Sequence, residues 1–200
     1  LATVNYLHGN RNSVGFLKAI NIADTFNTTL GSYNHRDVDR DIYNTLSSEI
    51  RLNQSFKIGK NQQVFSGGLR YCLSDIQRLQ KGIGSGGSDF DLSVTPDNAG
   101  KIYQRDLDLQ TQNIALFAEQ LFTIGKKLTL VPGFRAETIQ ASMSGRTNQV
   151  LGGYLSGIQK NRVIILGGLS AKYILLKKQT ANASLYANAN QNYRPVMYSE

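Results

Sequence analysis

Residues 41–57, DIYNTLSSEIRLNQSFK, alternate between apolar and polar side chains with a period of two. The even-numbered apolar positions are Ile42, Leu46, Ile50, Leu52 and Phe56. The odd-numbered positions from Thr45 to Lys57 carry hydroxyl, amide or charged side chains. Because successive side chains of a strand point to opposite faces, this stretch predicts a β-strand with one apolar and one polar face.

The same alternation continues along the chain in both directions. It is clearest in residues 163–175 and 181–189, and it recurs in residues 62–79 and 128–140. Residues 102–122 and 1–16 follow it less regularly. Seven strands are therefore expected.

The connections between these strands alternate in length. Short turns are expected at 59–61, 125–127 and 176–178, whereas long links cover 17–40, 80–101 and 144–160. This order is that of an up-and-down meander whose two ends face different surroundings. A strand over residues 41–57 would be about 56 Å long, far beyond the usual strand of about 5–6 residues.

Long strands with short turns at one end are typical of transmembrane β-barrels. The sequence therefore predicts an all-β fold, an antiparallel up-and-down transmembrane β-barrel. Seven strands fall below the smallest closed barrel of this type, which has about eight. We expect the chain to form part of a larger barrel.

Composition and charge narrow the function classes. The net charge of +8 is typical of nucleic-acid-binding proteins, but Lys and Arg occur singly or in pairs, so no nucleic-acid partner is expected. The single Cys72 excludes an internal disulfide and a cysteine-based zinc site. No apolar run approaches the roughly 20 residues of a transmembrane helix.

Several stretches resemble a known family. Residues 113–120, NIALFAEQ, and 128–137, LTLVPGFRAE, resemble a barrel hairpin of TonB-dependent outer-membrane receptors. Residues 38–43 (VDRDIY), 77–82 (QRLQKG), 87–92 (GSDFDL) and 192–199 (NYRPVMYS) are similar to the ferric-citrate, or Fe(III) dicitrate, receptor branch. The resemblance covers roughly residues 40–200.

This resemblance implies a location in the Gram-negative outer membrane and energised uptake of a ferric chelate, ferric citrate in the first place. It implies that residues 1–200 are a section of the barrel domain, without the plug domain or the remaining strands. The implied partners are the TonB complex, reached through that plug, together with outer-membrane lipid and lipopolysaccharide. The implied protein is a transporter and no enzyme.

Four basic residues are candidates for contact with such a ligand. Arg40, Arg78, Lys81 and Arg105 lie at the predicted loop ends of neighbouring strands. In a closed barrel they would point into one external vestibule, where guanidinium groups bind carboxylates bidentately. The alternative is that these four side chains are simply solvated or contact lipopolysaccharide phosphates.

No intrinsic cofactor, metal site or catalytic set is expected. His8 and His35 have no carboxylates at metal-ligand spacing. Asp37, Asp39 and Asp41 alternate, but without the rest of a calcium-loop pattern we expect solvated loop charges.

Three further sets of residues receive structural interpretations. Residues 82–87, GIGSGG, match a dinucleotide-binding pattern, but without a following helix they predict a flexible, hinge-like loop. An interfacial aromatic girdle is expected from Tyr43, Tyr71, Tyr103, Tyr173, Tyr193 and Tyr198. Arg70, Arg135, Glu49 and Glu137 are expected on the lumen face, paired with other charges.

Two other functions stay open. A plug-less, porin-like diffusion channel would use the same strands. A soluble β-rich binding module, such as a lectin-like sandwich, would instead have strands of about 5–6 residues that face a common core.

Overall fold

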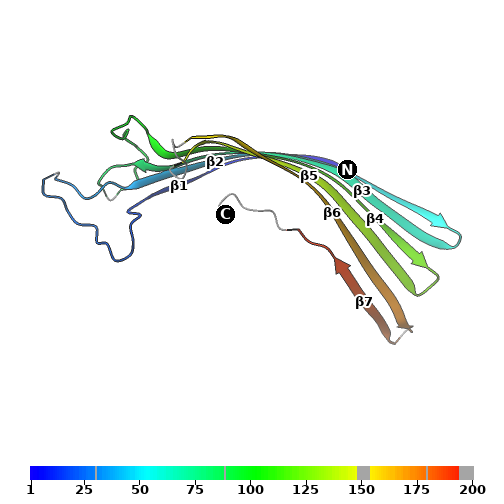
Figure 1. Cartoon of the computed structure of the whole chain (residues 1–200). Helices are drawn as coiled ribbons and strands as arrows, with labels where there is room; N and C mark the ends of the chain where they lie inside the picture. The colour runs from blue at the N-terminus through cyan, green and yellow to red at the C-terminus, as the bar shows by residue number, and fades with distance from the viewer. Residues whose placement is uncertain (30, 88, 148–153, 179, 194–200) are drawn as a thin grey trace.

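A computed structural model describes residues 1–29, 31–87, 89–147, 154–178 and 180–193. Its described residues form one antiparallel sheet of seven strands in the order β1-β2-β3-β4-β5-β6-β7 (Figure 1). The strands are β1 (Ala2–Gly15), β2 (Asp37–Ile58), β3 (Asn61–Ile83), β4 (Tyr103–Ile124), β5 (Leu128–Arg146), β6 (Tyr154–Lys177) and β7 (Asn182–Asn190). The predicted all-β meander of seven strands is confirmed.

Each strand pairs with its neighbours in sequence, and the short turns gather at one end of the sheet (Figure 1). Gly59 and Gly125 occupy two of these turns with φ of 62° and 61°. Glycine adopts this left-handed conformation without a steric penalty, which allows the chain to reverse within two or three residues. The long connections β1–β2 and β3–β4 lie at the opposite end, called the loop end below.

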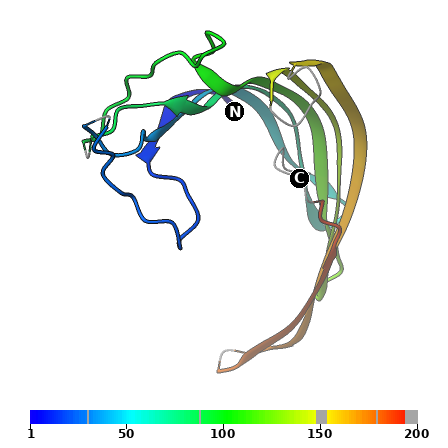
Figure 2. The ribbon, with the colours of Figure 1, turned by 60° about the vertical axis from the view of Figure 1, so that its left-hand side comes forward.

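The sheet curls around an open interior, so it has a convex and a concave face (Figure 2). In β4 the odd-numbered Leu107, Leu109 and Ala115 are buried, while the even-numbered Ile114 and Leu116 are exposed. Because side chains on the inside of a curved sheet are more crowded than those on the outside, we assign the odd positions of β4 to the concave face.

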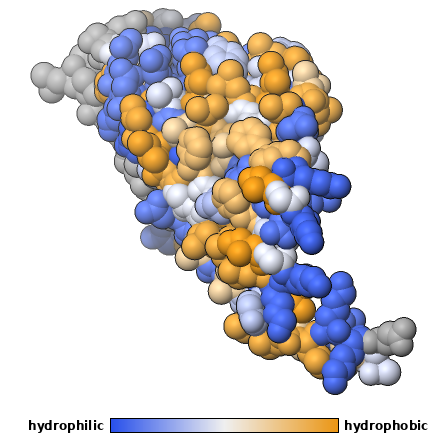
Figure 3. All heavy atoms as spheres, turned by 90° about the vertical axis from the view of Figure 1, so that its right-hand side faces the viewer, coloured by the Kyte–Doolittle hydropathy of each residue, from blue (hydrophilic) through white to orange (hydrophobic). Residues whose placement is uncertain are grey.

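In the central strands, exposed large apolar side chains occur only on the convex face. All exposed large apolar side chains of β2–β5 belong to it: Leu46, Ile50, Leu52, Phe56, Ile58, Leu69, Ile114, Leu116, Phe122, Ile124 and Phe134. Figure 3, viewed from the side of the short turns, shows hydrophobic side chains spread over the visible surface. A soluble protein rarely exposes an apolar surface of this extent.

The pairing register aligns these side chains across strands. Directly paired residues of β1–β6 form what we call the apolar row: Ala2, Ile50, Leu69, Leu116, Ala136 and Ile165. An apolar row that crosses six neighbouring strands fits contact with lipid chains, because the alternation of every strand is in phase.

The strands extend further into the loop end than the sequence predicts. Residues 37–40, 80–83, 144–146 and 154–160 were expected in long links but are part of strands. Backbone pairing continues there although the simple alternation of apolar and polar side chains lapses. The 22 residues of β4 span about 73 Å, so the sheet reaches well beyond a bilayer core of about 25 Å.

Candidate ligand-binding site at the loop end of the sheet

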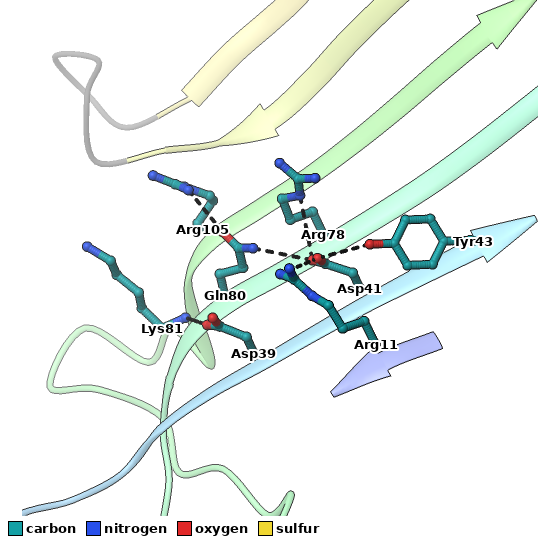
Figure 4. Close-up of polar contacts among 8 residues, drawn as sticks. All are labelled: Arg11, Asp39, Asp41, Tyr43, Arg78, Gln80, Lys81 and Arg105. Atoms are coloured by element: carbon teal, nitrogen blue, oxygen red, sulfur yellow. Dashed lines mark hydrogen bonds and ion pairs between the residues drawn. The ribbon is translucent and has the colours of Figure 1, made fainter. Parts of the chain in front are cut away.

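The concave face carries a fully buried carboxylate near the loop end. Asp41 of β2 is 0% exposed. Its Oδ2 lies 2.7 Å from Nη2 of Arg11 on β1, and its Oδ1 lies 3.6 Å from Nε of Arg78 on β3 (Figure 4). The hydroxyl of Tyr43 donates to Oδ2 at 3.3 Å. Three strands therefore meet at this one carboxylate.

These contacts explain how Asp41 remains buried. A buried carboxylate without partners is unfavourable by several kcal/mol, whereas guanidinium and hydroxyl donors offset the loss of hydration. The carboxylate in turn attracts the guanidinium groups of Arg11 and Arg78, although Nε of Arg78 has no hydrogen-bond partner among the described residues. The prediction that Asp37, Asp39 and Asp41 are solvated loop charges is wrong, because all three lie in β2 and Asp41 is enclosed.

A chain of hydrogen bonds links Asp41 to a third arginine. Gln80 donates from Nε2 to Oδ1 of Asp41 at 3.4 Å, and its Oε1 accepts from Nη1 of Arg105 at 2.9 Å. This bond occupies one of the five N–H donors of Arg105. Figure 4 shows Arg105 and Arg78 rising on the same side of the strands, with Gln80 between them.

A β-bulge positions Gln80. The register of β2 and β3 changes from Arg40↔Leu79 to Val38↔Gly82, which places Gln80 and Lys81 opposite Asp39. Lys81 has a φ of 56°, and its backbone N–H donates to Oδ1 of Asp39 at 2.8 Å. A left-handed lysine is disfavoured by about 1–2 kcal/mol, so this hydrogen bond stabilises a strained residue at the edge of the site.

The structure brings together three of the four predicted basic residues. Arg78, Lys81 and Arg105 lie within the group drawn in Figure 4. Arg40 does not join them: it precedes Asp41 in regular strand pairing, so its side chain leaves the opposite face. The expectation that all four share one vestibule is corrected for Arg40.

Sequence reasoning missed Arg11, Asp41, Tyr43 and Gln80 as members of this group. We call the set formed by Arg11, Asp39, Asp41, Tyr43, Arg78, Gln80, Lys81 and Arg105 the concave cluster. It holds four cationic side chains against two carboxylates, which leaves an excess of positive charge. An excess of cations beside fixed hydrogen-bond donors is suited to an anion that carries carboxylates.

Charges on the concave face nearer the short turns form their own pairs. Nη2 of Arg135 lies 2.8 Å from Oε2 of Glu137, and Arg51 pairs with Glu49. The guanidinium of Arg51 also lies 5.7 Å from the ring centre of Phe117. Arg70, Arg135, Glu49 and Glu137 all lie on the concave face, as expected for the lumen side. Of the four, Arg135, Glu49 and Glu137 pair with charges of the wall itself.

The predicted tyrosine girdle is only partly supported by position. Tyr71 and Tyr173 lie on the convex face by register. Tyr43 points to Asp41 on the concave face and Tyr103 is 8% exposed, so neither belongs to a lipid-facing belt. Tyr193 accepts from Nη1 of Arg162, and Tyr198 lies outside the described residues.

Arg36 joins the two long loops beside the concave cluster. Its backbone N–H donates to the carbonyl of Ser85 at 2.9 Å and its carbonyl accepts from Gly84 at 2.8 Å. Its Nε donates to the carbonyl of Gly87 at 3.0 Å, while Nη1 lies 2.5 Å from Oδ2 of Asp24. One residue thus ties the β1–β2 loop to the β3–β4 loop.

The glycines of residues 82–87 serve this junction. A Cβ on Gly84 would lie 2.7 Å from Cγ2 of Val38, and one on Gly86 would lie 2.6 Å from the carbonyl oxygen of Tyr33. Such distances are shorter than real contacts allow, so the glycines permit close packing of the loops. The hinge-like interpretation of this segment is replaced by a packing role, and Gly82 itself lies in β3.

Two aspartates fix turns in the β3–β4 loop. The backbone N–H of Lys101 donates to Oδ1 of Asp97 at 2.8 Å and lowers the pKa of that carboxyl. The hydroxyl and then the N–H of Ser93 lower the pKa of Asp91 in the same way. Hydrogen bonds to a carboxylate favour its charged form.

The described residues contain no group of three or more His, Cys, Asp or Glu side chains that would hold a metal ion. Nor does this part of the chain contain a helix long and apolar enough to cross a membrane.

A curved antiparallel sheet with an apolar convex face and a polar, charged concave face is the wall of a membrane barrel. Residues 2–199 match the family described as TonB dependent receptor-like, beta-barrel. The chain belongs to this family, whose members are outer-membrane receptors and transporters. No curated protein is similar enough to count as a match.

Proposed function

We propose that the chain forms part of the wall of an outer-membrane importer and that its concave cluster contacts an anionic ferric chelate, ferric citrate. Family membership supports the transport class. The choice of ferric citrate as the ligand rests on the excess of positive charge around Asp41 and Gln80. These residues lie on the face that would line the lumen.

The roles divide among the residues of the cluster. Arg78, Lys81 and Arg105 supply charge-assisted hydrogen bonds to the free carboxylates of the chelate, whose own oxygens hold the iron. Asp41 and Gln80 act as positioning residues, because Asp41 attracts the guanidinium of Arg78 and Gln80 accepts a hydrogen bond from Arg105 before the ligand arrives. Fixed donors lose less conformational entropy on binding than mobile ones.

The remaining partners follow from the family. Energy from the inner membrane would reach the importer through TonB and a plug domain outside residues 1–200, and the lipid chains of the outer membrane would cover the convex face. A plug-less diffusion channel is not favoured, because residues 2–199 match the TonB-dependent receptor family.

The test is binding of radiolabelled ferric citrate to the full-length protein in outer-membrane vesicles. Arg78→Gln with Arg105→Gln should weaken binding about 10–100-fold, because each lost charge-assisted bond accounts for about tenfold. Arg70→Gln is the matched control, since Arg70 shares the strand and face of Arg78 but lies nearer the short turns.

Unchanged ferric citrate binding by the double variant would remove these arginines from the site. Tight binding of an uncharged ferric hydroxamate, with none of ferric citrate, would overturn the proposed ligand. Uptake that persists after collapse of the proton-motive force would overturn the proposed energised import.

A further inference from the structure

The short-turn end of the sheet carries a concentration of positive charge. Exposed lysines lie in or directly beside each of its three turns, and we call them the lysine rim. Its members are Lys57 and Lys60 at the β2–β3 turn, Lys126 and Lys127 at the β4–β5 turn, and Lys177 and Lys178 at the β6–β7 turn. More than half of the lysines of the chain therefore lie at one end of the sheet.

No acidic side chain compensates this charge locally. Residues 50–74, 120–136 and 138–178 hold the three turns and the adjoining parts of the strands, and they contain no aspartate or glutamate. All aspartates of the chain lie between Asp24 and Asp108, in the long loops or in the loop-end half of the strands. Among the described residues, no ion pair includes a lysine of the rim.

The lysine rim begins directly where the exposed apolar surface ends. Three exposed apolar residues, Ile58, Ile124 and Leu175, stand near the short-turn ends of β2, β4 and β6. In each hairpin a lysine follows two residues later, at Lys60, Lys126 and Lys177. Because each lysine is compared with a residue of its own hairpin, the tilt of the strands does not affect this spacing.

This spacing places the lysines in the headgroup layer of a membrane. Two residues extend about 7 Å along a strand, and the headgroup layer reaches about 5–8 Å beyond the hydrocarbon core. A lysine side chain is also long enough to keep its stem along apolar surface while its ammonium group meets polar surroundings. The ammonium groups therefore lie at the depth of lipid phosphates when Ile58 and Ile124 contact lipid chains.

The three turns are close enough to act on one membrane surface. Neighbouring turns are two strands apart, which is about 10 Å at the usual strand spacing. Figure 1 shows them in sequence along one end of the sheet, and Figure 3, which views this end, shows hydrophilic residues directly beside hydrophobic ones. Clusters of four to eight basic residues next to a membrane-spanning segment attract anionic lipids.

The charge of the rim selects among phospholipids. The lysine ammonium is a compact point charge that binds phosphate without the planar geometry that arginine requires. Phosphatidylethanolamine carries its own ammonium group and has no net charge, whereas phosphatidylglycerol has a net negative charge. Six lysines without a nearby carboxylate therefore favour the anionic headgroup.

We propose that the lysine rim binds the phosphates of anionic phospholipids in the periplasmic leaflet of the outer membrane. The short turns of such barrels face the periplasm, which assigns the leaflet. The inference rests on the outer-membrane location but not on the identity of the ferric chelate.

The experiment uses the full-length protein in detergent, exchanged into phosphatidylglycerol or into phosphatidylethanolamine with the same acyl chains. Bound lipids are counted by native mass spectrometry. The wild-type protein should retain phosphatidylglycerol at least about fivefold better, which is the effect of a single lysine near an anionic surface. Equal retention would mean that the lysines contact only water and would overturn the proposal, as would a preference for phosphatidylethanolamine.

A pair of double variants locates the contact. Lys60→Gln with Lys126→Gln should lower the preference for phosphatidylglycerol at least about threefold. Lys18→Gln with Lys101→Gln is the matched control, because it removes the same charge from two exposed lysines of the long loops and should leave the preference unchanged. Equal losses in both double variants, or no loss in the first, would overturn the proposal.

A conservative variant separates charge from the shape of the turns. Lys60→Arg with Lys126→Arg keeps both charges and should keep the preference for phosphatidylglycerol. Loss of the preference in this variant would show that charge does not determine lipid retention and would overturn the proposal.

The two proposals fail separately. Loss of ferric citrate binding with intact preference for phosphatidylglycerol would overturn the chelate and leave the phospholipid contact standing. Normal ferric citrate binding without lipid preference would do the reverse.

Discussion

Asp41 and Arg11 form an ion pair across β1 and β2, with Oδ2 and Nη2 2.7 Å apart, in which the carboxylate is fully buried and the arginine side chain is 61% exposed. The pair is asymmetric: the aspartate depends on its partners for charge compensation, whereas the arginine also reaches solvent. The exposed guanidinium of Arg11 therefore presents positive charge at the surface, above the buried carboxylate of Asp41.

The first prediction concerns this buried charge. Asp41→Asn keeps the shape but removes the charge that Arg11 and Arg78 share, so it should lower the free energy of unfolding by about 1–3 kcal/mol. The urea midpoint of the full-length protein in detergent, followed by circular dichroism, measures this. Asp89→Asn in an exposed loop is the control, and equal midpoints for both variants would contradict the account.

A pair of glycines tests the packing of the concave face. A Cβ on Gly68 would overlap the backbone oxygen of Ile50 and lie 2.7 Å from Cζ of Phe117, whereas one on Gly133 would meet its nearest atom at 3.5 Å. Gly68→Ala should therefore destabilise the protein by about 1–3 kcal/mol, and Gly133→Ala should change stability by less than about 0.5 kcal/mol.

The same urea experiment compares the two variants with the wild type. A Gly68→Ala midpoint as high as that of Gly133→Ala would show that β2, β3 and β4 are not packed as described.

The junction at Arg36 predicts that the two long loops loosen together. Arg36→Ala removes the contacts with Asp24 and Gly87, so protease cleavage should rise both within residues 16–36 and within residues 84–102. Peptide mapping after brief proteolysis of intact cells reads out both segments. Lys18→Ala, an exposed change in the same loop, is the control.

Cleavage that rises only in residues 16–36 would show that the loops are independent. An independent disruption comes from Gly86→Val, which should expose both segments in the same manner because its side chain would meet the backbone of Tyr33.

Acid should open the turn at Asp97. The hydrogen bond from Lys101 lowers the folded-state pKa below the ordinary value of 3.8, so this stabilisation is complete above about pH 5 and is lost as the pH falls through the folded pKa. Pepsin cleavage within residues 91–101, normalised to an unstructured peptide, should therefore rise below about pH 3.8.

Asp97→Asn lacks the titrating group. Its normalised cleavage should already be raised at about pH 5 and should change less with pH. A wild-type profile that matches the variant throughout would contradict the role of this carboxylate.

The alternation of side chains predicts the strands and their faces but not their full length. Along Asp37–Arg40 and Gln80–Ile83 the chain has polar residues and glycine where apolar alternation would be needed for recognition. Those residues are held in strands by backbone pairing with neighbours, which is a property of register and not of local sequence.

The same reason explains what was missed in the concave cluster. Asp41 meets Arg11 and Arg78 only once three strands are aligned, and the bulge at Lys81 decides where Gln80 points. The position of Arg40 was within reach of sequence reasoning, because neighbouring residues of a strand point to opposite faces. The expectation for Arg40 is wrong because the residue lies in β2 and not in the predicted loop.

Both proposals depend on the sidedness of the wall, and collision rates of nitroxide spin labels test it most directly. Labels at Leu116 on the convex face and at Glu119 on the concave face, in a Cys72→Ser background in lipid vesicles, would report access to oxygen and to a water-soluble nickel chelate. We predict that the label at Leu116 collides mainly with oxygen and the label at Glu119 mainly with the nickel chelate. The reverse order, or equal access to the nickel chelate at both positions, would contradict the assignment of the convex face to lipid.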